Sequence, residues 1–349
     1  MRRYKTYING EWFEGTSGIV LRSVDPSNNK ELGEIVQNSK EDVEYAIESA
    51  SRSFYKTREW RDLDVQQRSD KLLKIADMIE SEIDEIAKTE SMDNGKPLRE
   101  AQADVDDAVH CFRYYAGLIR TPSGQTYNVN SNFGNMHSYT VKEPVGVCAL
   151  ITPWNFPFLM SVWKIAPALA AGNSIIFKPS SETVLSALKL FEILDKCDLP
   201  KGTANLVIGS GSTVGNLLAE SKKVDMITFT GSTSVGQGIM RAAVGNVKKI
   251  GLELGGKSPN IVFADTDIEK TVEWVMMGIF LNQGEVCCAG SRLIIEKSIK
   301  DKFLKKLVER TDKLTLGAPL DNPDMGPLIS KKHMQDVLGY IEKGKAEGA

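Results

Sequence analysis

Apolar residues recur at helical spacing through the first 120 residues of the chain. Residues 43–54, 65–90 and 99–119 each place hydrophobic side chains three or four positions apart, as on one face of an α-helix. The second stretch is followed by Asn94-Gly95-Lys96-Pro97, and glycine and proline together stop a helix. The pattern therefore predicts long helices before residue 120.

The pattern changes twice after these helices. Residues 121–142 are polar, with Tyr139 and Val141 alternating, which predicts an exposed hairpin-like arm. From Val145 onward, short apolar runs alternate with helical segments, and the runs with strand character are residues 145–151, 174–177, 205–208, 226–229 and 249–254. Such alternation predicts right-handed crossovers and a parallel sheet that is covered by helices on both faces.

The residues after each predicted strand are informative, because ligands of such sheets bind at the carboxyl ends of the strands. The turns are Thr152-Pro153-Trp154-Asn155-Phe156-Pro157, Lys178-Pro179-Ser180-Ser181, Gly209-Ser210-Gly211, residues 230–236 and Gly255-Gly256-Lys257. One glycine-rich turn is weak evidence, since loops need glycine for positive φ, but the recurrence at one edge favours a nucleotide. No G-x-G-x-x-G follows the first strand, so Gly231-Ser232, before a helix predicted to start near Thr233, is the best candidate for a pyrophosphate contact.

Composition narrows the class of protein. The chain has 349 residues, 42% apolar and 26% charged, which suits a globular protein of two domains. A net charge of −3 favours neither nucleic acid nor an anionic membrane as a partner. The most apolar segment, residues 158–172, contains Lys164 and Pro167 and is shorter than the roughly 20 residues of a membrane span, so it predicts a buried helix.

Two adjacent cysteines, Cys287 and Cys288, stand out among five in the chain. Neighbouring cysteines rarely form a disulfide with each other, and their spacing does not suit zinc, so no metal site is predicted. The odd, scattered cysteines suit a reducing cytoplasm. The residues alone leave two interpretations open: a nucleophile, or a pair of buried packing thiols.

Taken together, these stretches resemble the aldehyde dehydrogenase superfamily, with its betaine-aldehyde and broad-specificity branch nearest. The resemblance rests on the turns at 152–157 and 178–180, Phe229-Thr230-Gly231-Ser232-Thr233, Glu253-Leu254-Gly255-Gly256-Lys257-Ser258-Pro259-Asn260 and residues 282–290, and it extends back to Tyr7-Ile8-Asn9-Gly10-Glu11-Trp12. It implies an α/β fold with a parallel-sheet dinucleotide-binding domain (residues 1–120 and 143–254), a small β oligomerisation arm (121–142) and an α/β catalytic domain (255–349). Members of the family continue past the point where this chain ends, so we expect the catalytic domain to be incomplete.

The resemblance implies three catalytic residues: Cys287 as the nucleophile, Glu253 as the general base and Asn155 as an oxyanion donor beside the backbone N–H of Cys287. For Cys288 the packing interpretation is kept, or that of an oxidation-prone neighbour. The apolar neighbours of Glu253 predict burial, which would raise its pKa toward neutrality and suit a base. The alternatives are a surface glutamate on an edge strand and, for Asn155, a helix cap or turn.

The cofactor implied is NAD or NADP. Lys178 would hold the adenosine ribose and Ser232 the pyrophosphate, and the wider set of expected contacts is Ile151, Thr152, Pro153, Trp154, Ser180, Ser181, Gly211, Gly231, Gly236 and Leu254. Three positions after Lys178, where NAD-preferring relatives commonly carry glutamate, this chain has Ser181. A carboxylate would repel a 2′-phosphate and a serine can donate to one, so we predict that NADP is tolerated or preferred.

Phe156, Met160 and Trp163 resemble the substrate-tunnel positions of the family, although their helical spacing also fits plain helix core. An aromatic tunnel suits aliphatic, aryl or trimethylammonium aldehydes, the last by cation–π contact. None of the three histidines, His110, His137 and His333, is expected near these motifs, which argues against a Cys–His protease or a serine hydrolase.

The resulting hypothesis is oxidation of a small-molecule aldehyde to a carboxylic acid through a cysteine thiohemiacetal and thioester. Retention of Glu253 argues against the coenzyme-A-acylating relatives. The resemblance implies a homodimer or homotetramer for a full-length chain. The alternative hypothesis is an inactive fragment, or a binding or structural protein on the same scaffold.

Overall fold

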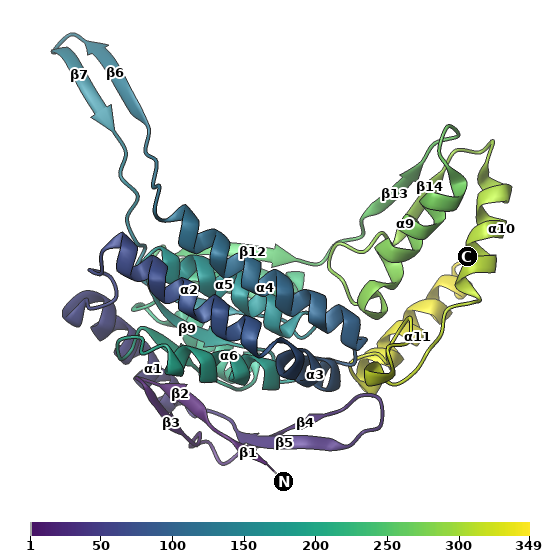
Figure 1. Ribbon diagram of the computed structural model, residues 1–349, viewed down its shortest axis with the longest axis horizontal. Helices are drawn as coiled ribbons and strands as arrows, with labels where there is room; N and C mark the ends of the chain where they lie inside the picture. The colour runs from purple at the N-terminus through teal and green to yellow at the C-terminus, as the bar shows by residue number, and fades with distance from the viewer. Residues whose placement is uncertain (1) are drawn as a thin grey trace.

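A seven-stranded sheet forms the centre of the computed structural model, which describes residues 2–349 (Figure 1). Its strand order is β12-β11-β8-β9-β10-β2-β3, in which the first five strands are parallel and β2 and β3 are antiparallel additions. The bounds are β12 (Lys249–Leu254), β11 (Met226–Gly231), β8 (Val147–Ile151), β9 (Ser174–Lys178), β10 (Ala204–Leu206), β2 (Thr6–Ile8) and β3 (Glu11–Phe13). The predicted parallel sheet is thus confirmed, although β10 ends before the predicted residue 208.

Helices cover both faces of this sheet, which is why β8 and β9 are buried at every position. On one face, Cys148 and Leu150 of β8 belong to a core built with α2 (Val65–Ser81), α3 (Ile83–Asn94), α4 (Leu98–Leu118), α5 (Pro157–Ala170) and α6 (Leu185–Lys196). On the other, Val147, Ala149 and Ile151 pack with α1 (Lys40–Arg52), α7 (Asn216–Glu220) and α8 (Thr233–Ala243). Successive side chains of the strand therefore serve two separate cores.

The helix predicted over residues 65–90 is two helices, and this prediction was wrong. The backbone leaves the helical region at Glu82 (φ −115°, ψ 14°), which separates α2 from α3. Apolar spacing continues on both sides of the break, so periodicity could not reveal it. α3 then ends as predicted at Gly95, whose φ is +98° and where a Cβ would lie 2.9 Å from Pro26 and from the Pro327 carbonyl oxygen.

A hairpin of β6 (Thr126–Ser131) and β7 (Gly134–Tyr139) extends far from the body of the molecule, as predicted for the exposed arm (Figure 1). Below the main body, β1 (Arg3–Tyr4), β5 (Glu31–Val36) and β4 (Val20–Val24) form a small sheet. A short π-helical segment, Ser53–Thr57, follows α1, and another, Gly211–Gly215, precedes α7.

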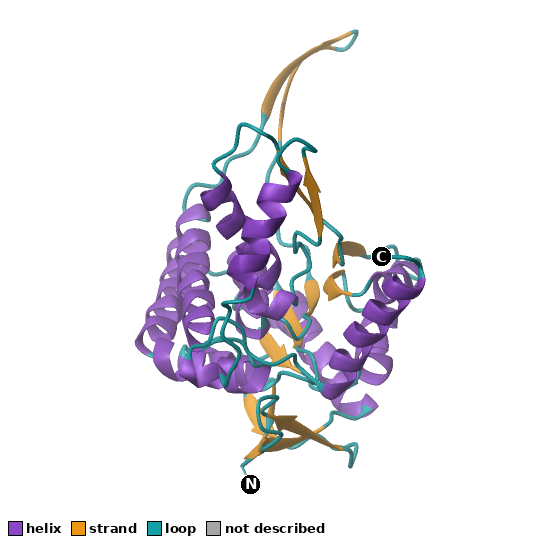
Figure 2. Cartoon of the chain, turned by 90° about the vertical axis from the view of Figure 1, so that its right-hand side faces the viewer, coloured by secondary structure: helices purple, strands orange, loops and turns teal. Residues whose placement is uncertain are grey.

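Residues 259–349 form a smaller α/β unit. It contains the parallel pair β13 (Pro259–Val262) and β14 (Arg292–Ile295) with α9 (Ile268–Phe280), α10 (Lys300–Thr311) and α11 (Lys331–Ala346), and short 3₁₀ turns at Leu281–Gly284 and Pro319–Asp321. Its own core contains Val262, Val272 and Phe303. Seen from the side, the strands lie between groups of helices, and the hairpin extends beyond them (Figure 2).

Candidate active site

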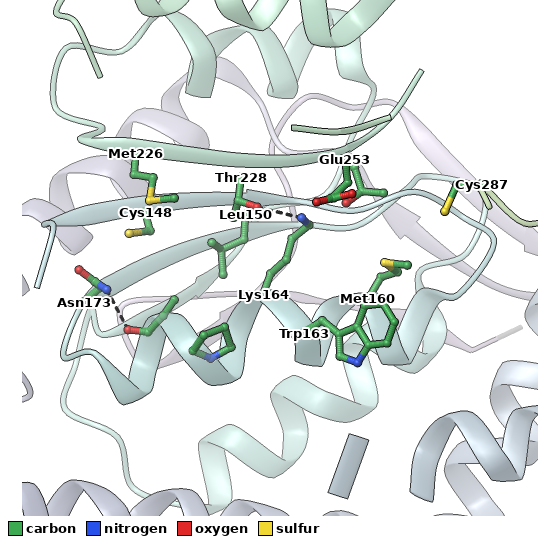
Figure 3. A pocket seen from close by; sticks show the side chains of 13 residues that line it. Cys148, Leu150, Met160, Trp163, Lys164, Asn173, Met226, Thr228, Glu253 and Cys287 are labelled. Carbon is green, nitrogen blue, oxygen red and sulfur yellow. Dashed lines mark hydrogen bonds between the residues drawn. The ribbon is translucent and has the colours of Figure 1, made fainter. Parts of the chain in front are cut away.

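A cavity of about 590 Å³ opens where β8, β11 and β12 face α5 (Figure 3). Its walls bring together residues that are far apart in the sequence, including Met160, Trp163, Lys164, Thr228, Glu253 and Cys287. Two of the three predicted catalytic residues and two of the three predicted substrate residues line this one cavity. The size suits a small organic molecule.

Cys287 follows a backbone segment of unusual conformation. Asn282 and Gln283 adopt left-handed φ of 48° and 58°, and Gly284 follows at 80°. Such geometry is costly for residues other than glycine and persists only when neighbours hold it. Two contacts do so: the Asn282 N–H donates to Glu100 Oε2 at 2.9 Å, and Asn282 Nδ2 donates to the Asn155 carbonyl oxygen at 2.8 Å.

The two thiols differ in environment. Cys287 is half-buried, and this burial, with the neighbouring Cys288, raises the pKa of its thiol. The resting Cys287 is therefore mostly protonated at neutral pH and needs a base to become a nucleophile. Cys288 is exposed, so the packing interpretation of this residue was wrong.

Asn155 is tied to the segment that carries Cys287. Its Nδ2 donates to the Glu285 carbonyl oxygen at 2.8 Å, which leaves the second amide hydrogen available. Its buried Oδ1 has no hydrogen-bond partner within residues 2–349. Asn155 does not cap α5, because Phe156 occupies the cap position.

Glu253 is exposed, so the predicted burial of this carboxyl was wrong. The reason is tertiary: β12 is the edge strand of the sheet, and among the described strands none pairs with its outer edge. The backbone after Glu253 still approaches the nucleophile, because a Cβ at Gly256 would lie 2.9 Å from the Cys287 carbonyl oxygen. Glycine at this position therefore permits the close approach of the two segments.

Lys164 is a site residue that the sequence analysis missed. It lies on α5 and is buried, and its Nζ donates to Thr228 Oγ1 at 2.9 Å, pointing toward Glu253 (Figure 3). Burial lowers the pKa of Lys164 to about 8, and the Glu253 charge partly opposes this shift. The signal was present in the sequence, since a single lysine in the most apolar helix requires a polar partner.

Of the predicted substrate residues, Met160 and Trp163 line the cavity from α5, whereas Phe156 does not. Instead, the Lys96 ammonium lies over the Phe156 ring, 4.2 Å from the ring centroid, in a cation–π contact. Lys96 is fully buried and pairs with Asp104 at 2.5 Å. Phe156 thus packs against a buried charged cluster formed by Lys96, Glu90 and Asp104.

The turn after β8 supplies Ile151, Thr152, Pro153 and Trp154, the first group of expected cofactor contacts. Ile151 and Thr152 are buried, and Pro153 and Trp154 are half-buried. The Thr152 Oγ1 atom is buried and has no hydrogen-bond partner among residues 2–349. An unsatisfied buried hydroxyl is uncommon and is consistent with a polar ligand at this place.

The turn after β9 supplies Lys178, Ser180 and Ser181. Lys178 is buried, its Nζ donates to the Pro179 carbonyl oxygen at 3.1 Å, and burial lowers its pKa to about 8. Ser180 Oγ accepts from the Glu182 N–H at 3.2 Å. Ser181 Oγ donates to the Gly209 carbonyl oxygen at 2.9 Å, so this hydroxyl must break that bond before it can donate to a 2′-phosphate.

The remaining expected contacts lie around the start of α8 and the segment before α7. Ser232 caps α8, so the predicted start at Thr233 is confirmed. Gly231 and Gly236 allow close packing, since a Cβ at Gly236 would lie 2.8 Å from Leu254 Cδ2. Gly211 is exposed and begins the π-helical segment.

His333 corrects another expectation. Although it lies in none of the motifs, α11 places its ring 5.1 Å from that of Trp154 and its Nε2 3.6 Å from Glu285 Oε1. No pattern in the sequence indicated this contact, because it depends on how α11 folds back against the site.

Residues 12–349 match the sequence model of the aldehyde dehydrogenase family, so the chain belongs to this family. It is 46% identical over 344 residues to betaine aldehyde dehydrogenase of Bacillus subtilis (strain 168), a match that covers 98% of the chain and 70% of that protein. It is 43% identical over 347 residues to the peroxisomal aminoaldehyde dehydrogenase 1 of Pisum sativum, with 98% and 69% covered.

A crystal structure of betaine aldehyde dehydrogenase from Staphylococcus aureus, in complex with NAD+, superposes with a TM-score of 0.94 at 42% identity. The match covers 99% of this chain and 68% of that one, which confirms the fold class predicted from the sequence. Among the described residues, none of the helices combines the length and hydrophobicity needed to cross a membrane.

Proposed function

We propose that this chain oxidises an aldehyde to a carboxylic acid with NAD or NADP as the hydride acceptor, using Cys287, Asn155 and Glu253. The observation that carries the proposal is the shared cavity, in which Cys287 and Glu253 meet Met160 and Trp163. The family membership supports the reaction class. The NAD+ complexes of the Staphylococcus aureus relative support the cofactor.

The residues at the strand ends fit such a cofactor. Thr152 carries a buried hydroxyl without a partner in the described chain, and Ser232 begins a helix whose N-terminal N–H groups suit a pyrophosphate. Lys178 would face the adenosine ribose. When bound, the nicotinamide supplies the acceptor for the hydride.

Each catalytic residue then has one task. The Cys287 thiol gives its proton to solvent water, and the thiolate sulfur adds to the aldehyde carbon to form a thiohemiacetal. The free Asn155 amide hydrogen and the Cys287 N–H stabilise the oxyanion. Departure of the hydride leaves a thioester on Cys287. Glu253 then takes a proton from water, which attacks the thioester and releases the carboxylate.

The cavity wall supports a substrate class. Trp163 offers an aromatic face, and Glu253 adds a carboxylate to the cavity wall, partly offset by the neighbouring Lys164. Both favour an aldehyde with a positively charged group, bound in part by cation–π contact. The names of the Bacillus subtilis and Pisum sativum relatives agree with trimethylammonium and amino aldehydes.

The test is a kinetic panel of betaine aldehyde, amino, aliphatic and aryl aldehydes against NAD+ and NADP+, with formation of reduced nicotinamide as the readout. We expect aldehyde-dependent reduction with at least one cofactor. If no aldehyde supports reduction while nucleotide still binds, the alternative of an inactive fragment is correct. The mass of the purified chain is measured in parallel, so that the activity is assigned to a chain of 349 residues.

We also infer that the β6–β7 arm joins copies of this chain. Its exposed apolar side chains, among them Phe133 at 96% and Tyr139 at 66% exposed, support an interface. Replacing residues 126–139 by a glycine-serine turn should give a monomer by light scattering. An unchanged assembly state would refute the inference.

A further inference from the structure

Glu285 lies two residues before the proposed nucleophile and connects three parts of the site. Its side chain is only 1% exposed, and its Oε1 accepts from the Ile329 N–H at 3.0 Å. Its own carbonyl oxygen accepts from Asn155 Nδ2 at 2.8 Å and from Asn282 Nδ2 at 3.4 Å. The backbone of Glu285 thus holds the oxyanion donor, while its side chain holds the segment that leads into α11.

His333 extends this connection. It lies in the first turn of α11, where its N–H donates to Ser330 Oγ at 3.2 Å, and its Nε2 is 3.6 Å from Glu285 Oε1. The same ring packs edge-on against Trp154, the residue before Asn155. One helix therefore contacts the residues next to Asn155 and the segment that precedes Cys287.

We propose that Glu285, together with His333, is a positioning residue that fixes Cys287 relative to Asn155. The inference rests on the proposed function, in which these two residues share one oxyanion. Misplacement by about 1 Å can reduce a rate about 100-fold, so the segment at 282–287 needs such support. Its left-handed residues make the need greater, because they adopt this geometry only when held.

The charge of Glu285 is part of this role. The titratable groups near its side chain are Lys96 from the turn before α4 and His333 from α11. Glu100 of α4 accepts from the N–H of Asn282, whose side chain donates to the Glu285 carbonyl oxygen. Burial raises the pKa of Glu285 to about 7, and the Ile329 N–H and Lys96 oppose the shift. As pH rises through this value the carboxylate forms, and its hydrogen bond to the Ile329 N–H becomes charge-assisted.

The test measures Cys287 directly and does not require turnover. In a Cys288→Ser background, the rate of iodoacetamide alkylation at Cys287 is followed by peptide mass spectrometry between about pH 5.5 and 10.5. The variants are Glu285→Gln, Glu285→Ala and His333→Gln. The matched controls are Glu347→Gln on the exposed end of α11 and His110→Gln, whose imidazole faces Asp106 on the surface.

We expect two inflections in the parent: thiol ionisation and a second one near neutral pH, which Glu285→Gln removes. Glu285→Ala should slow hydride transfer about tenfold or more, while KM for the nucleotide stays within about twofold of the parent value. Glu285→Gln should restore most of this rate. Both control variants should match the parent. Identical alkylation profiles in the parent, Glu285→Gln and His333→Gln would overturn the proposal. If Glu285→Ala does not fold by circular dichroism, those profiles decide the question.

The same experiment separates the two proposals. A chain that shows the Glu285-dependent inflection but reduces no nucleotide would retain the positioning role and lose the proposed function. A chain that turns over aldehyde without that inflection would retain the function and lose the positioning role.

Discussion

Replacing Lys164 by methionine should stabilise the protein at neutral pH. Lys164 is buried beside the cavity, and burial lowers its pKa from 10.5 to about 8. At 1.36 kcal/mol for each tenfold change in the ionisation constant, keeping this lysine charged in the folded state costs about 3 kcal/mol. Methionine has a similar length and removes that cost, but it loses the hydrogen bond to Thr228, worth about 1 kcal/mol. The net gain at pH 7 is therefore about 2 kcal/mol.

The gain depends on pH with a definite sign. The folded pKa is depressed, so the cost is fully present below about pH 8 and decreases as pH rises toward 10.5, above which the lysine is neutral in both states. Urea denaturation at pH 7 and near pH 10 measures the difference in unfolding free energy between Lys164→Met and the parent. Lys88→Met, at an exposed position on α3, is the control and should show no such dependence. A gain that is absent at pH 7, or equal at both pH values, would refute the reasoning.

Three further substitutions test the catalytic and cofactor assignments. Asn155→Ala removes an oxyanion donor and should slow single-turnover hydride transfer about 10²–10³-fold, and a loss below about threefold would contradict the role. Glu253→Gln should still form the thioester but hydrolyse it slowly, so reduced nucleotide appears as a burst without steady turnover; a normal steady state would exclude Glu253 as the base. Ser181→Glu places a carboxylate near the ribose and should raise the kcat/KM ratio of NAD to NADP about tenfold, whereas an unchanged ratio would show that Ser181 does not contact this part of the cofactor.

The central strands β8 and β9 could be predicted because they are buried on both faces and therefore form continuous apolar runs. β12 agrees with its predicted range at both ends, and β8 and β9 differ by two residues or fewer. The break at Glu82 could not be predicted, since the apolar spacing continues across it. Local patterns thus located the strands but not the bend between two helices of similar composition.

In the candidate site, too, local motifs could be predicted, whereas features set by tertiary structure could not. The short segments that carry Asn155, Glu253 and Cys287 are continuous in the chain and could be recognised in the sequence. The exposure of Glu253 depends on β12 lying at the sheet edge, and the contact of His333 with Trp154 depends on the path of α11. Lys164 is an intermediate case. A lysine within an apolar helix can be recognised in the sequence, but its hydrogen-bond partner Thr228 can be identified only in the structure.

The most direct test of the central claim is to locate the acyl group on the enzyme. The Glu253→Gln chain is mixed with an aldehyde and NAD+, quenched, digested and analysed by peptide mass spectrometry. We predict an acyl adduct on Cys287, formed in equal amount with reduced nucleotide and absent without NAD+. An adduct on Cys288, or nucleotide reduction without any acyl group on Cys287, would contradict the account.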